Sequence, residues 1–173
     1  MKAKGRRGKG TSRQPKTKPT PGKVARPSRP FEFLDHPADV GFRARGQTLA
    51  ELFAAAALAL CDYGWDLETV RARQTIELRV RAASLEDLLY SWLSEVLFLT
   101  DAEGWVFKRF AVSRVAKSGS GQRELWEVQG VGRGERFDTK RHRARTYIKA
   151  VTYHQLAVEQ KRGGWQATVY LDV

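Results

Sequence analysis

The sequence contains very little cysteine, since Cys61 is the only one among 173 residues. A single thiol cannot form an internal disulfide, and it cannot supply the several thiolates of a structural zinc site. Cys61 lies in an Ala- and Leu-rich segment that is predicted to be helical, so we interpret it as a buried apolar side chain rather than a nucleophile. This cysteine usage fits a reducing compartment, and we expect a cytoplasmic protein.

Long apolar runs and nucleotide-binding motifs are also lacking. No stretch is long and apolar enough to span a bilayer, so we expect no membrane partner. The sequence has no G-x-x-x-x-G-K-[ST] phosphate loop, no helix-opening G-x-G-x-x-G, no H-E-x-x-H and no G-x-S-x-G. We therefore expect that the chain does not bind GTP alone and has no hydrolase or nucleotidyltransferase activity of its own.

Acidic residues are absent from residues 1–30, although the chain carries a formal net charge of +12. Residues 1–30 hold 11 Lys and Arg, which leaves 20 bases and 19 acids in residues 31–173. Because residues 1–30 contain almost no large aliphatic side chains, we predict a disordered basic tail before one folded domain at residues 31–173. The tail is either a solubilising extension or a weak, salt-sensitive arm for RNA or DNA.

Two strand–helix units follow one another in the first half of the domain. Residues 40–46 alternate apolar and basic side chains, as a half-buried strand does, and a helical pattern follows after a cap at Thr48. The same order recurs from residue 76, with a second cap at Ser84. The expected core-facing stripes are Leu49, Leu52, Phe53, Ala56 and Leu60 in the first helix, and Leu85, Leu88, Leu89, Trp92 and Val96 in the second.

The second half of the domain has the pattern of β-strands. The polar loop at residues 117–123 predicts a hairpin between strands at 107–116 and 124–132. Together with the two helical segments, these strands predict an α+β domain in which two helices pack on one largely antiparallel sheet.

A second hairpin is predicted at the end of the chain. Residues 147–160 alternate as one strand, and the KRGG turn leads to a last strand at 165–173. Folding this hairpin about its turn sets Asp172 opposite Tyr153 or the neighbouring His154, with a slip of one residue possible.

Residues 31–173 resemble the archease family along nearly their whole length. The resemblance is carried by the segments DHPADVGFRARGQTLAELF, LLYSWLSEVLF, GERFDTKRH, IKAVTYH and the final LDV. It implies an archease-like fold and a protein activator of the GTP-dependent RNA ligase of tRNA splicing and RNA repair. Such an activator promotes guanylylation of the ligase and repeated turnover, and it is not itself an enzyme. One difference is Pro37, where the family usually has Thr.

The resemblance also implies a metal site, which in the family is usually assigned to calcium. It assigns the ligands to Asp39, Asp172 and Val173, the last through its backbone or terminal carboxylate. Oxygen ligands of this kind suit a hard cation, so magnesium and manganese are the alternatives to calcium. Without a cation these negative groups would repel one another, and a bound metal would therefore also stiffen both ends of the domain.

Four further residues are candidates for supporting this metal or contacting the ligase. Asp35 is expected to be a structural acid of the turn, and His36 to orient a carboxylate or contact a partner, because imidazole is a poor calcium ligand. His154 is expected on the apolar face of its strand, either as a core histidine or in a role near Asp172. His142 belongs to the basic run DTKRHRAR, which is either a solvated loop or a contact to the ligase or its RNA.

The sequence is also compatible with two other functions. The chain could be an RNA-binding or chaperone-like module that acts through its basic tail, and deletion of residues 1–30 separates this function from ligase activation. A metal-dependent hydrolase is the other alternative, although no motif predicts turnover.

Overall fold

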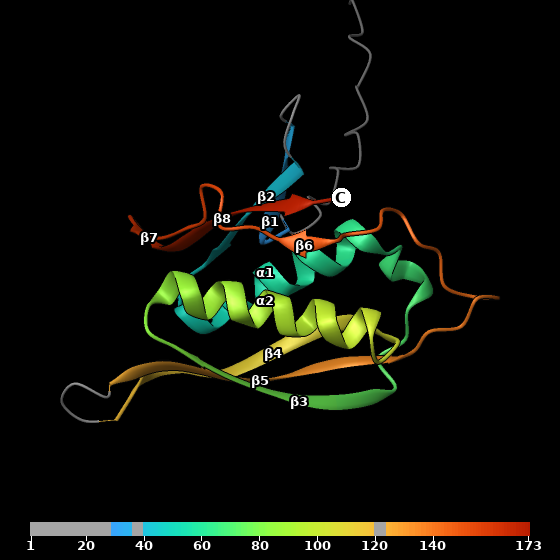
Figure 1. The fold of residues 1–173 in the computed structure, drawn as a ribbon, viewed down its shortest axis with the longest axis horizontal. Coiled ribbons are helices and arrows are strands. Elements are labelled where there is room, and N and C mark those ends of the chain that lie inside the picture. The colour runs from blue at the N-terminus through green and yellow to red at the C-terminus, as the bar shows by residue number, and fades with distance from the viewer. Residues whose placement is uncertain (1–28, 36–39, 120–123) are drawn as a thin grey trace, which may run out of the picture.

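The structure is a computed structural model, and it describes residues 29–35, 40–119 and 124–173. Two helices lie as a middle layer between two antiparallel sheets, one of five strands and one of three (Figure 1). The predicted α+β class is confirmed, with the difference that the strands form two sheets, on opposite sides of the helices, where one was expected. Predictions for residues 1–28, His36, Pro37 and Asp39 lie outside the described residues.

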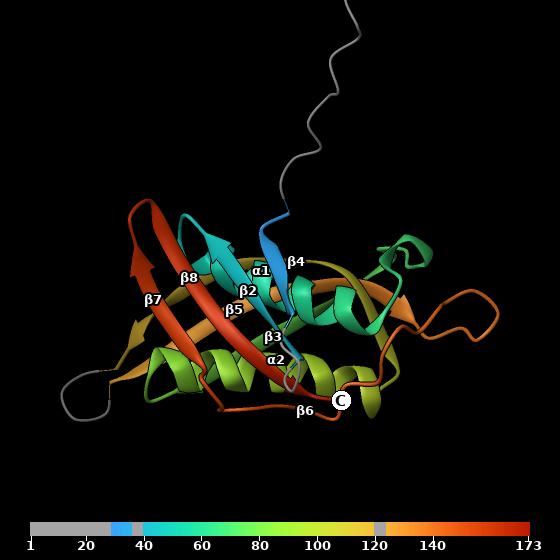
Figure 2. The ribbon, with the colours of Figure 1, turned by 90° about the horizontal axis from the view of Figure 1, so that it is seen from above.

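The five-stranded sheet contains both ends of the folded domain. Its strands are β1 (Phe31–Asp35), β2 (Val40–Gly46), β6 (Ala150–Val151), β7 (Ala157–Lys161) and β8 (Gly164–Asp172). Strand β8 pairs with β2 on one side and with β6 and β7 on the other, and Figure 2 shows β2, β8 and β7 side by side. The first two strands and the last strand of the domain therefore belong to the same sheet.

The three-stranded sheet consists of β3 (Gln74–Ala82), β5 (Leu125–Arg136) and β4 (Trp105–Ser118), in that order. The pairing of Ser118 with Leu125 confirms the predicted hairpin between β4 and β5. Gly132 of β5 is required by packing, because a Cβ atom there would lie 2.7 Å from ring atoms of Phe107. This glycine lets the aromatic core approach the central strand.

Helices α1 (Leu49–Gly64) and α2 (Leu85–Asp101) begin at the predicted caps. The backbone N–H of Glu51 donates to the Thr48 hydroxyl at 3.2 Å, and the N–H of Asp87 donates to the Ser84 hydroxyl at 3.0 Å. Each cap satisfies a donor that the first turn would otherwise leave unbonded. The predicted stripes face the core, with Leu49 and Leu85 partly buried and the other members fully buried.

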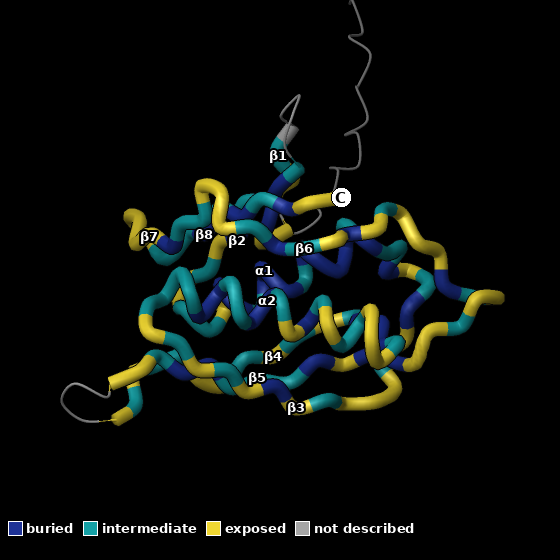
Figure 3. The backbone as a smooth tube through the Cα atoms, viewed as in Figure 1, coloured by how far each residue is buried: buried dark blue, intermediate teal, exposed yellow. Residues whose placement is uncertain are grey.

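The buried residues run along both helices and the sheet faces that cover them (Figure 3). Trp92 of α2 is completely buried, and its indole N–H donates to the carbonyl oxygen of Phe53 in α1 at 3.1 Å. The same ring lies edge-on to Phe110 of β4, so one side chain joins both helices to the three-stranded sheet. No helix in the described ranges is long and apolar enough to cross a membrane.

Two residues assigned to the basic tail are bonded to the domain. The guanidinium of Arg29 lies 2.5 Å from the Asp62 carboxylate, and the carbonyl of Pro30 accepts from the backbone N–H of Arg45 at 2.8 Å. Asp62 is almost fully buried in α1, so this ion pair joins the beginning of the described chain to the helical layer.

The prediction that residues 147–160 form one strand is wrong. Strands β6 and β7 are separated by a turn at residues 152–156, in which Gln155 has a φ of 48°. Strand β7 pairs with β8 in the register that the KRGG turn sets, and extending that register would place Tyr153 opposite Asp172. The turn loops out three residues of the chain, so Ala150 pairs with Asp172 instead.

Candidate functional site

The end of β1, the start of β2 and the end of β8 lie at the same edge of the five-stranded sheet. Asp35 pairs with Val40, and Val40 pairs with Leu171. Since directly paired residues of neighbouring strands lie about 5 Å apart, the chain leaves and re-enters the sheet beside the last residues of β8. Asp39 itself lies outside the described residues, but it immediately precedes Val40.

A shallow depression opens at this edge of the sheet. It is lined by Val40, Thr152, His154, Tyr170, Leu171, Asp172 and Val173. These residues come from β2, from the turn after β6 and from the end of β8, so the depression is formed where three separate segments of the chain meet. It therefore contains both C-terminal residues that are candidate metal ligands.

The C-terminal oxygen atoms at this edge contact the positively charged side chain of Lys149. The backbone N–H of Lys149 donates to the carbonyl of Asp172 at 2.8 Å, which fixes the position of the strand end. The Lys149 ammonium donates to the carbonyl oxygen of Val173 at 2.8 Å and lies 3.9 Å from a carboxylate oxygen of Asp172. The Asp172 side chain is 59% exposed, so a metal ion could reach its carboxylate from solvent.

The available donors are hard oxygen atoms, which suit calcium, magnesium or manganese. Among residues 29–35, 40–119 and 124–173, no three His, Cys, Asp or Glu side chains form a group that could hold a metal ion. Of the predicted ligands, only Asp172 and Val173 lie among the described residues.

His154 is not on a core-facing strand, as was predicted, but is exposed in the turn between β6 and β7. The three residues looped out of the register move it from the sheet to the rim of the depression. Its ring lies edge-on to Tyr170 with centroids 5.6 Å apart, and its Nε2 is 3.0 Å from the Gln155 side-chain nitrogen. Of the two roles considered for His154, the core role is wrong, and the structure places it in the same depression as Asp172.

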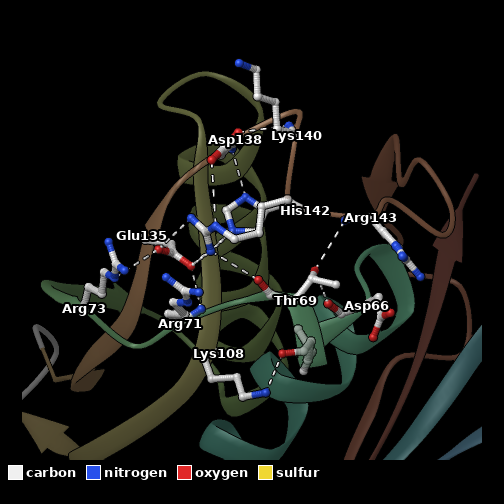
Figure 4. Close-up of polar contacts among 12 residues, drawn as sticks. Asp66, Thr69, Arg71, Arg73, Lys108, Glu135, Asp138, Lys140, His142 and Arg143 are labelled. Atoms are coloured by element: carbon white, nitrogen blue, oxygen red, sulfur yellow. Dashed lines mark hydrogen bonds and ion pairs between the residues drawn. The ribbon is translucent and has the colours of Figure 1, made fainter.

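His142 is buried, which contradicts the prediction of a wholly solvated basic loop (Figure 4). Its Nδ1 accepts from the backbone N–H of Asp138 at 2.9 Å, and its Nε2 lies 3.1 Å from an oxygen of Glu135. The ring therefore carries its hydrogen on Nε2 and donates it to the carboxylate. The other side of the ring stacks with Phe137 at a centroid distance of 5.9 Å. His142 thus holds the loop in place and has no exposed surface for a partner.

Glu135 is the centre of this cluster, and sequence reasoning missed it. Arg141 binds both carboxylate oxygens, at 2.5 and 3.0 Å, and the backbone N–H of Arg71 donates to one of them at 2.6 Å. The hydrogen bonds from Arg141 and Arg71 lower the pKa of Glu135 to about 2, against the effect of burial. Arg141 also donates to the carbonyl of Thr69, in the short 3-10 helix η1 (Leu67–Thr69). The cluster therefore ties the loop after β5 to the segment before β3.

Cys61 has the predicted structural role. It is buried in α1, and burial raises the pKa of its thiol to about 12, so the thiolate is scarce near neutral pH.

Comparison with known proteins identifies the family. The family model of the Archease protein family (MTH1598/TM1083) matches residues 31–173. Protein archease of Methanopyrus kandleri is 38% identical over 144 residues, which cover 83% of this chain and 99% of the relative. Protein archease of Pyrococcus furiosus is 38% identical over 146 residues, covering 84% of this chain and 99% of the relative. The solution structure of protein 1598 of Methanobacterium thermoautotrophicum superposes with a TM-score of 0.68 at 31% identity, covering 84% of this chain and 99% of that one. The chain belongs to the archease family.

Proposed function

We propose that this archease activates a GTP-dependent RNA-splicing ligase by promoting its guanylylation and repeated turnover. The proposal includes a calcium ion held by Asp39, Asp172 and Val173, and a cytoplasmic setting. The observation that supports it most directly is the β1–β2–β8 register, because Val40 lies opposite Leu171 at the edge where both candidate ligand segments end.

The chain's own residues prepare this edge in two ways. Pairing with Ala150 and the bond from the Lys149 N–H hold the backbone of Asp172 at a fixed place on the sheet. The exposed carboxylate of Asp172 and the carbonyl of Val173 then present oxygen atoms on one side. A bound calcium ion would neutralise these oxygens together with Asp39 and would cross-link the β1–β2 turn to β8.

A role as activator, without turnover of its own, fits the described residues. The side chains that line the depression include the carboxylate of Asp172 and the imidazole of His154. Beside it, the ring of Tyr153 is 55% exposed and stacks on Tyr90 with centroids 4.0 Å apart. A rigid exposed aromatic beside charged groups suits docking to another protein. Such a protein can shift the ligase only by binding one of its states better than another.

The test is guanylylation of the ligase by GTP in the presence of calcium and either wild-type protein or a charge-neutralised variant. Asp39→Asn and Asp172→Asn are each expected to reduce stimulation at least about tenfold, because each removes an anionic ligand. Glu159→Gln, an exposed carboxylate on β7 of the same sheet, is the matched control and should stimulate like wild type. Full stimulation by both Asp variants would contradict the proposal.

A further inference from the structure

From the Arg109–Arg133 pair to Arg81, the outer face of the three-stranded sheet is exposed and rich in arginine, whereas the loop after β5 and η1 cover it at Glu135. Its inner face packs on α1 and α2, through residues such as Leu78, Phe107 and Val128. The residues that alternate with them point away from the helices. Five exposed arginines lie on this outer side, which we call the arginine face: Arg79, Arg81, Arg109, Arg114 and Arg133.

The strand register arranges these arginines in two rows across the sheet. In one row Arg109 of β4 lies directly opposite Arg133 of β5. In the other, Arg114 of β4 and Arg79 of β3 lie on either side of Gln129 in β5. The strip between the rows carries Ala111, Val131 and Glu77, and these three residues line part of a shallow depression.

The first row is electrostatically unfavourable in the protein alone. Cross-strand neighbours have Cβ atoms about 5 Å apart, and like charges placed directly opposite one another destabilise a sheet. Within the described ranges, Arg109, Arg114 and Arg133 form no ion pair with an acidic side chain, so no direct pair offsets the repulsion between Arg109 and Arg133. An anion bound across the row would remove this penalty.

Elsewhere on the arginine face, a buried carboxylate holds two of the arginines in place. The carboxylate of Glu127 is 2% exposed and contacts both Arg79, at 2.9 Å, and Arg81. The hydrogen bond from Arg81 is the largest cause that lowers the pKa of Glu127, to about 2, so this carboxylate stays ionised in neutral solution. It orients the two guanidinium groups while their outer N–H groups remain exposed.

The composition of the face favours a phosphate backbone over an acidic protein. Specific protein interfaces are anchored by exposed aromatic or apolar side chains at their centre. Among the large exposed apolar residues of the described chain, only Leu125 belongs to β3, β4 or β5, and it lies at the end of its strand. Arginine, in contrast, is suited to planar, bidentate binding of phosphate oxygens.

We propose that the arginine face binds the phosphate backbone of an RNA strand, and the choice of RNA among polyanions rests on the proposed function. The three-stranded sheet and the sheet with the C-terminal edge lie on opposite sides of the helices (Figure 1). A ligase docked at the C-terminal edge would therefore leave the arginine face open to its RNA substrate. Strand β4 is about 45 Å long at its full 14 residues, which allows contacts to several successive phosphates.

The experiment measures binding of a fluorescent single-stranded RNA oligonucleotide to the full-length chain by anisotropy, without ligase, over a series of salt concentrations. The test variant is Arg109→Ser with Arg133→Ser. The matched control is Arg43→Ser with Arg45→Ser, which removes two arginines from the five-stranded sheet and leaves the basic residues 1–30 unchanged. Thermal unfolding verifies that each variant folds.

We expect the test variant to bind RNA roughly tenfold more weakly at about 0.1 M salt and to lower the slope of log affinity against log salt by about 1.4. The control should keep both the affinity and the slope of wild type. Equal losses in both variants would show binding by net charge alone, and no loss in either would show that other basic residues bind the RNA. Weaker binding to the ligase with unchanged RNA affinity would assign the face to a protein, and each of these three results would overturn the proposal.

Guanylylation of the ligase without RNA separates this inference from the proposed function. The test variant should stimulate guanylylation normally, whereas Asp172→Asn should fail to stimulate and keep its RNA affinity. Loss of stimulation in the arginine variant would contradict the assignment of separate surfaces.

Discussion

The two sheets pack on the same helical layer, but they differ sharply in charge. The strands of the five-stranded sheet carry Arg43, Arg45 and Lys161 against Glu32, Asp35, Glu159 and Asp172. The three-stranded sheet has eight basic residues against three acidic ones: Arg79, Arg81, Lys108, Arg109, Arg114, Lys117, Arg133 and Arg136 against Glu77, Glu127 and Glu135. A folded domain that is nearly neutral in total therefore presents one balanced surface and one basic surface.

Both sheets also contain a Glu–Arg ion pair, but the two pairs differ in their exposure to solvent. In the five-stranded sheet, Glu32 is 46% exposed and binds Arg45 at 2.7 Å and Arg43 at 3.0 Å. At the end of the three-stranded sheet, Glu135 is 6% exposed and binds Arg141 from the following loop. Exposed pairs contribute little because water screens them, whereas breaking a buried pair leaves a charge without compensation. The comparison predicts that only the second pair has a structural role.

The largest effect is expected in the helical layer on which both sheets pack. Trp92→Ala removes a fully buried indole that bonds to α1 and contacts β4, and should lower the free energy of unfolding by about 3–5 kcal/mol. Urea denaturation measures this loss, and one transition for the whole domain is expected. Phe98→Ala, on the same helix with 55% exposure, is the control and should cost less than about 1 kcal/mol. Separate transitions for the two sheets would contradict the shared core.

The next effect compares the two ion pairs directly. Glu135→Gln should lower Tm by roughly 5–10 °C at neutral pH, while Glu32→Gln should change it by about 1–2 °C or less. The pKa of Glu135 is lowered from 4.5 to about 2, so its stabilisation is complete above pH 4.5 and is lost as the pH falls toward 2. Thermal unfolding between pH 2 and 7 should therefore show a steeper acid loss in wild type than in Glu135→Gln. Equal Tm values for the two variants at neutral pH would refute the distinction.

A smaller effect is expected at the C-terminal edge. Lys149→Met removes the ammonium that contacts the oxygens of Val173 and Asp172 and would compete with a metal ion. Calcium affinity, measured by calorimetry, should rise by about three- to tenfold. Lys161→Met on β7 removes an equal charge, paired with Glu159, and should leave the affinity unchanged. Weaker calcium binding by Lys149→Met would show that this lysine supports the site.

The smallest effect concerns the turn that interrupts the edge of the five-stranded sheet. Gln155 has a φ of 48°, which costs less for glycine, so Gln155→Gly should raise the free energy of unfolding by about 0.5–1 kcal/mol. Gln160→Gly in β7 should lower it by a similar amount, because glycine weakens a strand interior. Chemical denaturation compares the two, and destabilisation by both would argue against this turn geometry.

Local patterns in the sequence predicted the local elements well. The caps at Thr48 and Ser84 and the stripes of both helices depend on spacing within a few residues, and all of them are present. Both hairpins were also predicted, since their turns are marked by polar or glycine-rich segments. The α+β class follows from these elements alone.

The predictions that failed concern contacts between elements or side chains, which the pattern within one element does not show. The repeated strand–helix pattern does not reveal that its two strands belong to different sheets, because pairing partners lie far along the chain. The alternation through His154 matched a continuous strand, and only the pairing of Ala150 with Asp172 reveals the looped-out turn. His142 lies in a run of basic residues typical of a solvated loop, and its burial depends on Glu135, seven residues earlier. The GERFDTKRH segment contained both partners of that cluster.

The most direct test of the cation site is a calorimetric titration of calcium into the full-length chain, its Asp172→Asn variant and the Glu159→Gln control. We predict that wild type and the control each bind one calcium ion, with affinity at least about tenfold weaker in Asp172→Asn. Equal calcium affinity in Asp172→Asn and wild type would contradict it.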